Sequence, residues 1–310
     1  MSRLQQQAQA YLHLRQALGH KMAHAVRLLP QFVAALDQQG GPTVTTAAAV
    51  AWAQATPHPV APAAQQQRLS VARGFARFMV GVDPATEIPP ADLLVPHRAR
   101  RPPFIYSRDD VRALMAAARR ISPDSFRGAT LATLIGLLGV TGLRIGEALR
   151  LTDPEIEWAS GLLRIQDTKF GKSRAVVLDA STLTALGDYV DLRNQRVPPP
   201  RAPHVFVTPG GAPVPYRRVG EAFRAVVQAA GVGAQARTRP HLHDLRHAFA
   251  VRTLVTWYQR GAEVEAWLPR LSTYLGHTSP RETYWYLTAV PDLLHAAAQR
   301  VPAWQTGGAE

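Results

Sequence analysis

Short polar motifs mark the breaks between apolar segments throughout the last two thirds of the chain. They contain two arginines, a lysine, two histidines and a tyrosine. In sequence order these are Arg144, Lys169, His243, Arg246, His277 and Tyr286. Each motif is common by itself, but the whole set supplies what an attack on a phosphodiester without a metal requires: positive charge, proton-transfer groups and a hydroxyl nucleophile. Together and in this order, the motifs are therefore strong evidence for that chemistry.

The bulk composition fits a chain that binds a polyanion. The 310 residues allow one large or two modest domains, and a hydrophobic fraction of 46% suffices for substantial cores. The net charge of +13 favours a nucleic acid as the partner. No cysteine is present, which excludes disulfides and thiolate metal sites. Because no signal peptide and no long apolar run is evident, we expect a cytoplasmic protein without a membrane partner.

Residues 1–90 are rich in alanine and glutamine and predict a small helical domain. Apolar residues recur at helical spacing over residues 22–36, with Pro30 expected to bend or divide the segment. Further helices are predicted at residues 47–53 and 65–80. The last of these carries three basic side chains that we expect to contact DNA: Arg68, Arg73 and Arg77.

Residues 91–103 form a basic, proline-rich linker in the sequence. Proline makes such a segment stiff and extended, and arginines suit a phosphate backbone. We therefore expect Arg98, Arg100 and Arg101 to contact DNA, although a solvated basic loop explains the same pattern.

Residues 104–310 predict a second domain that mixes helices with a small β-sheet. Ser107 is a suitable N-cap for a helix ending near residue 120, and Gly142 should end an apolar helix so that Arg144 opens the next. Strands are expected at 162–168 and 175–178, joined by a hairpin, with a third at 205–207. The remaining helices are predicted at residues 218–230, 244–258, 263–268, 282–287 and 291–300.

Several of the polar residues have a functional and a plain structural interpretation. Glu147 lies one turn after Arg144, so the two form either an ordinary intrahelical ion pair or a steadied guanidinium facing a cleft. His243 and Arg246 are three residues apart and share a helix face, where they could present a proton-transfer group beside a phosphate-binding fork. His243 also suits a core or capping position.

Other residues leave further alternatives open. His243 and His247 have metal-ligand spacing, but no third ligand is evident. Lys169 and Lys172 compete for one role in the hairpin, and turn lysines are usually solvated. Tyr286 has a competitor in Tyr284, and aromatic clusters are usually packing.

Together these motifs resemble the tyrosine recombinase, or phage integrase, family over residues 104–300. The family's Thr-Gly-Leu-Arg-x-x-Glu stretch matches residues 141–147, its His-x-Leu-Arg motif matches residues 243–246, and its Leu-Gly-His matches residues 275–277. Its hairpin lysine matches Lys169, counted back from the strand that begins at Arg174. Its nucleophile, nine residues beyond the histidine, matches Tyr286.

The resemblance implies a fold class, a mechanism and partners. The fold would be mainly α with a small antiparallel β-sheet: a helical core-binding domain (1–90), the linker (91–103) and an α+β catalytic domain (104–310), closing as a C-shaped clamp on double-stranded DNA. The catalytic residues would be Arg144, Lys169, His243, Arg246, His277 and the nucleophile Tyr286, with Glu147 in support. Lys172 would bind DNA. No metal and no cofactor would be needed.

The implied function is site-specific recombination through a 3′-phosphotyrosyl intermediate, for a mobile genetic element. The synapse would be a homotetramer, with accessory recombinases as further partners. Three alternatives compete with this hypothesis. A type IB topoisomerase-like nicking enzyme shares the chemistry without strand exchange. A metal-dependent single-strand nickase would use His241 and His243 with the tyrosines. A non-catalytic DNA-binding relative would lack a catalytic residue, and none is missing here.

Overall fold

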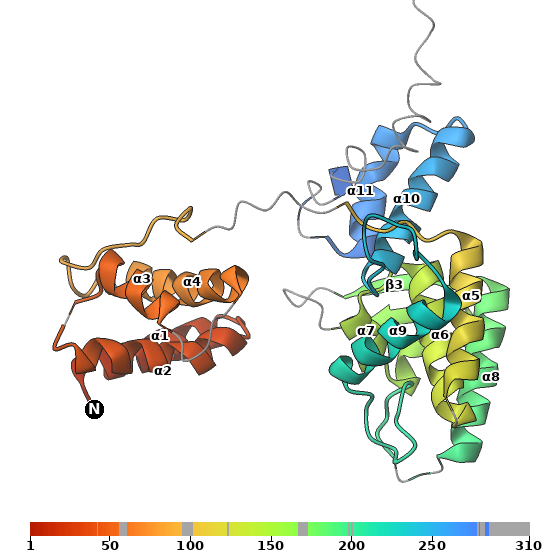
Figure 1. The fold of residues 1–310 in the computed structure, drawn as a ribbon, viewed down its shortest axis with the longest axis horizontal. Helices are drawn as coiled ribbons and strands as arrows, with labels where there is room; N and C mark the ends of the chain where they lie inside the picture. The colour runs from red at the N-terminus through yellow and green to blue at the C-terminus, as the bar shows by residue number, and fades with distance from the viewer. Residues whose placement is uncertain are drawn as a thin grey trace, which may run out of the picture. The chain divides into compact units, whose positions relative to one another are not determined.

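The chain forms two compact units, Met1–Arg100 and Arg101–Glu310, in a computed structural model. The structure describes residues 1–41, 43–55, 61–94, 102–122, 124–166, 173–197, 199, 201–277, 279 and 283–284. Figure 1 labels the helices of both units and strand β3 of the second, and each unit is described by itself below.

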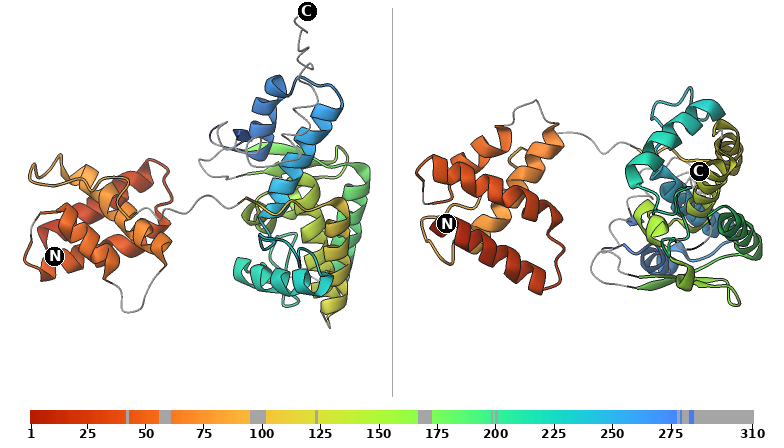
Figure 2. Two further views of the ribbon diagram at one scale, coloured as in Figure 1. Left: turned by 45° about the horizontal axis from the view of Figure 1, so that its top comes forward. Right: turned by 90° about the horizontal axis from the view of Figure 1, so that it is seen from below.

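The described residues of the first unit form four helices: α1 (Arg3–Ala17), α2 (Ala23–Gln38), α3 (Thr46–Gln54) and α4 (Pro62–Met79). Their apolar faces enclose a core in which Leu29, Phe32, Leu69 and Phe75 have no solvent exposure. Side-chain oxygens start two of the helices, because Ser2 and Thr45 accept hydrogen bonds from backbone N–H groups in the first turns of α1 and α3. Figure 2 shows the four helices packed together in two further views.

Two features of this unit differ from the sequence prediction. Helix α1 was not predicted, because its glutamine-rich sequence buries only Leu4, Ala8 and Tyr11 and so lacks a clear apolar stripe. Helix α2 runs without a break through Pro30, so the proline does not divide the segment. Burial of apolar residues on both sides of Pro30 compensates for the backbone hydrogen bond that proline cannot make.

The second unit contains seven α-helices among the described residues and one three-stranded sheet. The helices are α5 (Arg108–Ile121), α6 (Ser125–Thr141), α7 (Ile145–Arg150), α8 (Ala180–Arg196), α9 (Tyr216–Ala230), α10 (Asp244–Gln259) and α11 (Val264–Leu275), with a 3₁₀ turn at Asp153–Glu155. The central helix α6 is buried along most of its length and packs against α5, α8 and α10 (Figure 1).

The sheet is antiparallel, in the order β1 (Ile156–Glu157), β2 (Leu162–Ile165) and β3 (Arg174–Val177). Leu163 of β2 pairs with Ile156 on one side and Val176 on the other, and all three side chains are buried. The predicted hairpin strands are therefore present. Its turn, residues 167–172, lies outside the described residues.

The strand predicted at residues 205–207 is wrong, and the third strand of the sheet is β1 instead. Val205, Phe206 and Val207 are buried, so their apolar character reflects the core. Their backbone is held by isolated contacts: the Val205 N–H donates to the Leu151 carbonyl, and the carbonyls of His204 and Val205 accept hydrogen bonds from Arg193. These partners replace the ladder that a strand would need.

A glycine turn between α6 and α7 places the first arginine of the motif set. Gly142 ends α6 in the left-handed region (φ 63°), and a Cβ at this position would lie 2.5 Å from the Phe249 ring of α10. Only glycine fits this turn without strain. Arg144 follows as the N-cap of α7, as the sequence predicted.

The predicted fold class is confirmed: the described part of the chain is mainly helical, with one small antiparallel sheet. Helix α8 was not predicted, and α11 extends beyond the predicted residues 263–268 through Pro269. Within the described ranges, no helix has both the length and the apolar character needed to cross a membrane.

Candidate active site

Arg144 joins three parts of the second unit. Its Nη1 donates to Glu147 Oε1 (3.0 Å), and its Nη2 donates to the carbonyl oxygen of Gly276 (2.7 Å), the residue that ends α11. The Arg144 side chain remains 30% exposed. Both terminal nitrogens of the guanidinium are therefore held by the protein, while part of the side chain is still accessible to a ligand.

Glu147 holds two guanidinium groups. Besides Arg144, it accepts hydrogen bonds from Arg174 Nη1 (3.1 Å) and Nη2 (2.7 Å). Burial alone would raise the pKa of Glu147, but the hydrogen bonds and charge of Arg174, with those of Arg144, lower it to about 2. The carboxylate is therefore charged at neutral pH, and the predicted Arg144–Glu147 pair is part of a larger cluster.

Arg174 is a residue of this cluster that was not predicted from the sequence. It begins β3, two residues before the buried Val176, and alternate residues of a strand share a face. An arginine on a buried strand face needs an anionic partner, and this rule could have suggested one. The identity of that partner, Glu147, depends on the three-dimensional fold.

Arg246 is 2% exposed and fastens α10 to the same turns. Its Nη1 donates to the Gly142 carbonyl (2.8 Å), and its Nη2 donates to the Leu275 carbonyl (2.5 Å). Arg144 and Arg246 thus bind adjacent carbonyls, those of Gly276 and Leu275. The structure brings these two predicted arginines to one place from helices far apart in the sequence.

His277 follows Gly276 and completes this cluster. Its Nδ1 lies 2.7 Å from the hydroxyl oxygen of Thr283, which is buried. Burial and the charges of Arg246 and Arg144 lower the pKa of His277 to about 3. The ring is therefore neutral at physiological pH, so it has one N–H to donate and one nitrogen to accept.

His243 is the N-cap of α10 and lies one turn before Arg246. Its ring contacts that of His247 edge-on, with 4.8 Å between the ring centroids. Its charge is one of the smaller causes that lower the pKa of His277, after burial, Arg246 and Arg144. Across the described ranges, no group of three or more histidine, aspartate or glutamate side chains has an arrangement that could hold a metal ion.

Two of the predicted catalytic residues, Lys169 and Tyr286, lie outside the described residues, as do Lys172, Arg98, Arg100 and Arg101. Tyr284, the competitor of Tyr286, is described and has a side chain that is about half exposed. The structure therefore brings together Arg144, Glu147, Arg246 and His277, with His243 beside them.

The three arginines of α4 that were expected to contact DNA have different surroundings. Arg68 donates to the carbonyls of Trp52 and Ala55, and its guanidinium lies 4.0 Å from the Trp52 ring centroid. Arg73 donates to the carbonyls of Pro89 and Pro90. Arg77 is exposed. Two of the three thus have internal hydrogen bonds, and DNA contact by all three stays a prediction.

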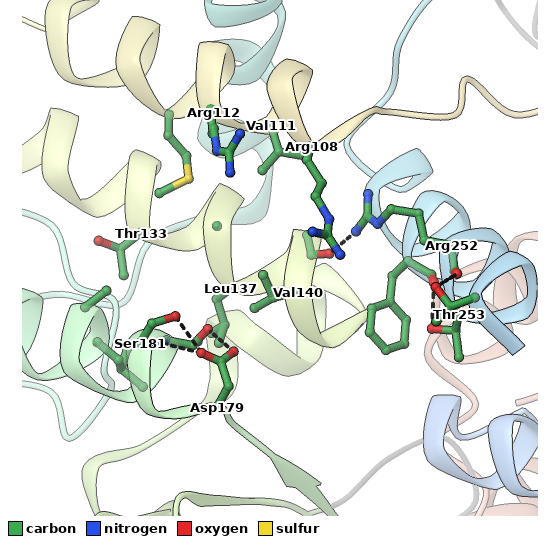
Figure 3. Close-up of a pocket in the computed structure, with 18 of the residues that line it drawn as sticks. Arg108, Val111, Arg112, Thr133, Leu137, Val140, Asp179, Ser181, Arg252 and Thr253 are labelled. Carbon is green, nitrogen blue, oxygen red and sulfur yellow. Dashed lines mark hydrogen bonds between the residues drawn. The ribbon is translucent and has the colours of Figure 1, made fainter. Parts of the chain in front are cut away.

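A separate trough of about 740 Å³ lies over α6, between α5, α8 and α10 (Figure 3). Its lining includes the arginines Arg108, Arg112, Arg119, Arg252 and Arg260. The carboxylate of Asp179 accepts hydrogen bonds from the hydroxyls of Ser181 and Thr182 (Figure 3). Arg252 donates to the backbone carbonyls of Tyr106 and Gly139. The trough is thus an arginine-rich surface distinct from the cluster around Glu147.

The fold and the site together indicate the tyrosine recombinase class of DNA strand transferases. Arg144, Arg246 and His277 come together in a mainly helical domain and follow one another in the order of that family's motifs. The sequence model of the phage integrase family matches residues 105–291, and the chain belongs to this family.

Relatives of known name agree with this class. An inferred integrase/recombinase of Sinorhizobium fredii, y4rB, is 40% identical over 97% of this chain and 98% of its own length. The tyrosine recombinase XerD of Caulobacter vibrioides is 31% identical over 80% of this chain and 78% of its own. The family match, with these two relatives, supports a DNA recombinase.

Solved structures show the same fold at low sequence identity. The Tn1549 transposon integrase in complex with transposon right-end DNA superposes with a TM-score of 0.65 at 16% identity, covering 96% of this chain and 99% of that one. The XerH site-specific recombinase bound to its difH substrate has a TM-score of 0.61 at 18% identity, covering 83% and 72%.

Proposed function

We propose that this protein is a site-specific recombinase that cuts and rejoins double-stranded DNA through a 3′-phosphotyrosyl intermediate at Tyr286. The observation that carries the proposal is the convergence of Arg144, Arg246 and His277 on the turn at residues 275–277, supported by Glu147. Two guanidinium groups and a neutral imidazole form a suitable cradle for one phosphodiester.

The roles of the residues follow from the chemistry of phosphoryl transfer. Arg144 and Arg246 would bind the non-bridging oxygens and offset the charge that grows on them in the transition state. The Tyr286 oxygen would form a bond to phosphorus as the bond from phosphorus to the 5′ oxygen breaks. His243 would help to accept the tyrosine proton, and Lys169 would protonate the departing 5′ oxygen.

His277 would donate a hydrogen bond to the same phosphate. Its depressed pKa keeps it neutral before DNA binds, so it does not add a third full charge to the empty site. If the Thr283 hydroxyl donates to Nδ1, the ring proton is on Nε2, the nitrogen on the opposite side. This tautomer would present the donor to the phosphate.

The covalent intermediate conserves the energy of the phosphodiester. Attack by the 5′ hydroxyl of another strand reverses the reaction and joins new partners without ATP. Exchange between two DNA sites calls for four protomers, so we propose a homotetramer in the synapse, with accessory recombinases as further partners. The two units would close as a clamp on the DNA, in the cytoplasm.

A mobile genetic element is the biological context that we propose. The relative in Sinorhizobium fredii, which matches nearly the whole chain, bears an integrase/recombinase name, and the transposon integrase shares the fold. Chromosome-dimer resolution is the competing role, which no feature of the sequence excludes. The DNA that flanks the gene would distinguish them, because an element has ends beside its integrase gene.

The decisive experiment is to trap the covalent complex. Nicked duplexes tiled across the flanking DNA are incubated with the full-length protein, and a protein–DNA band that survives denaturation marks cleavage. We expect Tyr286→Phe to abolish this band while DNA binding remains, because only the attacking oxygen is lost. Tyr284→Phe is the matched control and should retain the band.

Three outcomes would contradict the proposal. Loss of the band in Tyr284→Phe alone would move the nucleophile. A requirement for Mg²⁺ or Mn²⁺ after EDTA treatment would favour the metal-dependent nickase, whereas the proposed cations are arginines and a lysine. Relaxation of supercoiled DNA without joining of two sites would indicate a type IB topoisomerase-like enzyme.

A further inference from the structure

Arg174 is a buried arginine at the centre of the proposed active site. Its side chain is 9% exposed, and it begins β3, the strand that follows the hairpin turn. Both terminal nitrogens donate to Glu147, at 3.1 and 2.7 Å. This two-pronged pairing fixes both the distance and the orientation of the two groups, which a lysine cannot do.

Glu147 also accepts hydrogen bonds from Arg144, so its fixed position limits where the Arg144 guanidinium can lie. Each carboxylate oxygen accepts one hydrogen bond from each arginine: Oε1 from Arg144 Nη1 and Arg174 Nη1, and Oε2 from the Arg144 backbone N–H and Arg174 Nη2. One negative charge thus faces two positive charges. The cluster keeps a net positive charge at neutral pH, and the carboxylate cannot move without moving both guanidinium groups.

Arg174 also approaches the turn that carries His277. A Cβ at Gly276 would lie 2.8 Å from Arg174 Nη1 and 3.3 Å from Arg144 Nη1, and the φ of this residue is +68°. Both the backbone conformation and the two guanidinium groups therefore require glycine here. The start of β3, the α6–α7 turn and the end of α11 meet at this point.

We propose that Arg174 is a positioning residue for DNA cleavage, which acts through Glu147 to hold the Arg144 guanidinium where it binds the scissile phosphate. The inference rests on the proposed function. Arg174 does not itself bind the phosphate. Its removal would leave Glu147 held by Arg144 alone, so that Arg144 would be drawn toward the carboxylate and away from the DNA.

If Arg174 acts through Arg144, the effect of removing Arg174 should depend on the charge of the scissile phosphate. Arg144 stabilises negative charge on the non-bridging oxygens, so a misplaced Arg144 harms a charged phosphodiester most. A methylphosphonate, in which a methyl group replaces one non-bridging oxygen, carries no such charge. A defect that arises through Arg144 should therefore be much smaller on a methylphosphonate than on the natural linkage.

The test uses full-length Arg174→Ala and Arg174→Lys with nicked duplexes of the cleaved site, made with either linkage at the scissile position. At saturating DNA, we expect Arg174→Ala to form the covalent complex on the order of 10²-fold more slowly on the phosphodiester, with a clearly smaller loss on the methylphosphonate and unchanged DNA affinity. Arg174→Lys should fold and still be slow, because a single ammonium cannot replace the fork. Arg164→Ala is the matched control, since Arg164 is an exposed arginine of β2 that pairs with Glu157.

A double-mutant comparison tests the route through Glu147. If Arg174 acts through this carboxylate, Glu147→Gln should cost much less in the Arg174→Ala background than in the wild type. Folding of each variant is checked by its thermal unfolding.

Three results would overturn the inference: a folded Arg174→Lys that cleaves at the wild-type rate, equal losses on both linkages, or rescue of Arg174→Ala by sulfur at the bridging 5′ position. The last would mean that Arg174 acts through the leaving-group proton. Absence of a covalent complex with the wild-type protein would contradict the proposed function itself, so the two failures are distinguishable.

Discussion

At the scale of single residues, the site depends on charges that are held in place by backbone carbonyls. Arg144 and Arg246 donate to the carbonyls of Gly276 and Leu275, so their positions depend on the turn that ends α11. The two arginines lie near the starts of different helices, Arg144 at α7 and Arg246 at α10. The arrangement allows two positive charges to lie together, because Glu147 and these carbonyl dipoles offset their repulsion.

The depressed pKa of His277 predicts how stability changes with pH. Because burial and Arg246 lower this pKa to about 3 from a usual value near 6.5, the unfolded chain binds more protons than the folded one between these values. Stability should therefore fall as the pH is lowered from 6.5. The contribution is at most about 1.4 kcal/mol per pH unit, and less because the ring is partly exposed.

This dependence can be measured by urea unfolding at pH 7.5 and 5.5. His277→Gln should lose less stability over this interval than the wild type. Glu147 contributes little there, because its stabilisation is lost only as the pH falls from 4.5 toward 2. His241→Gln, which changes an exposed side chain, is the control. Equal pH dependence of His277→Gln and the wild type would contradict the prediction.

A second prediction at this scale separates Lys169 from Lys172. If Lys169 is the general acid, Lys169→Ala should cleave a normal phosphodiester slowly and recover on a substrate with sulfur at the bridging 5′ position, because a thiolate leaves without a proton. Lys172→Ala should show a smaller defect and no recovery. Rates of covalent-complex formation on the two substrates decide the question, and recovery of Lys172→Ala instead would transfer the role to that residue.

The sequence predicted the pairs that depend on local spacing and missed those that depend on the fold. Arg144 and Glu147 are three residues apart at a helix start, so their contact follows from helix geometry. Arg174 meets Glu147 only because the tertiary fold brings the first residue of β3 to the side chain of Glu147 in α7, and no local rule contains that information. The prediction that Arg144 and His277 belong to one site likewise came from the family resemblance and not from the periodicity of the sequence.

At the scale of elements, the sequence predicts a helix or strand correctly where the buried residues recur with the period of that element. Helix α5 has a Ser107 cap and a strong apolar stripe, and its predicted range is nearly correct. Helix α8 was missed because it buries only Leu186, Tyr189 and Arg193. Residues 205–207 are as apolar as a strand, but side chains and loops bind their backbone.

Arg193 of α8 is the main link between that helix and the segment at 204–205. It is 1% exposed and donates to both oxygens of Asp153 and to the carbonyls of His204 and Val205. We expect Arg193→Ala to lower the free energy of unfolding by on the order of 3 kcal/mol, because these acceptors lose their donor.

Urea unfolding of the full chain would measure this effect. Arg217→Ala is the control, because Arg217 forms an exposed i,i+4 pair with Glu221 that is worth less than about 0.5 kcal/mol. A similar small loss in both variants would show that α8 does not depend on Arg193.

At the scale of the whole molecule, the excess of positive charge is the property that sequence alone establishes most directly. Lysines and arginines number 35 against 22 aspartates and glutamates. A charge of this size predicts that DNA binding weakens steeply with salt, since each phosphate contact releases counterions. Fewer arginines of the first unit are available to contact phosphates than the sequence suggests, because Arg68 and Arg73 already donate hydrogen bonds to carbonyls of their own unit.

The final prediction concerns the linker arginines Arg98, Arg100 and Arg101, which lie outside the described residues. If the two units close around a duplex as proposed, the segment at residues 91–103 has to pass close to the phosphates. Replacing all three with alanine should weaken binding to every sequence alike and reduce the slope of log K against log salt by up to about 3. The matched control replaces three exposed arginines of α5, Arg112, Arg119 and Arg120, and removes the same charge. If both triple variants change the slope equally, the effect comes from net charge alone, and the linker does not follow the DNA.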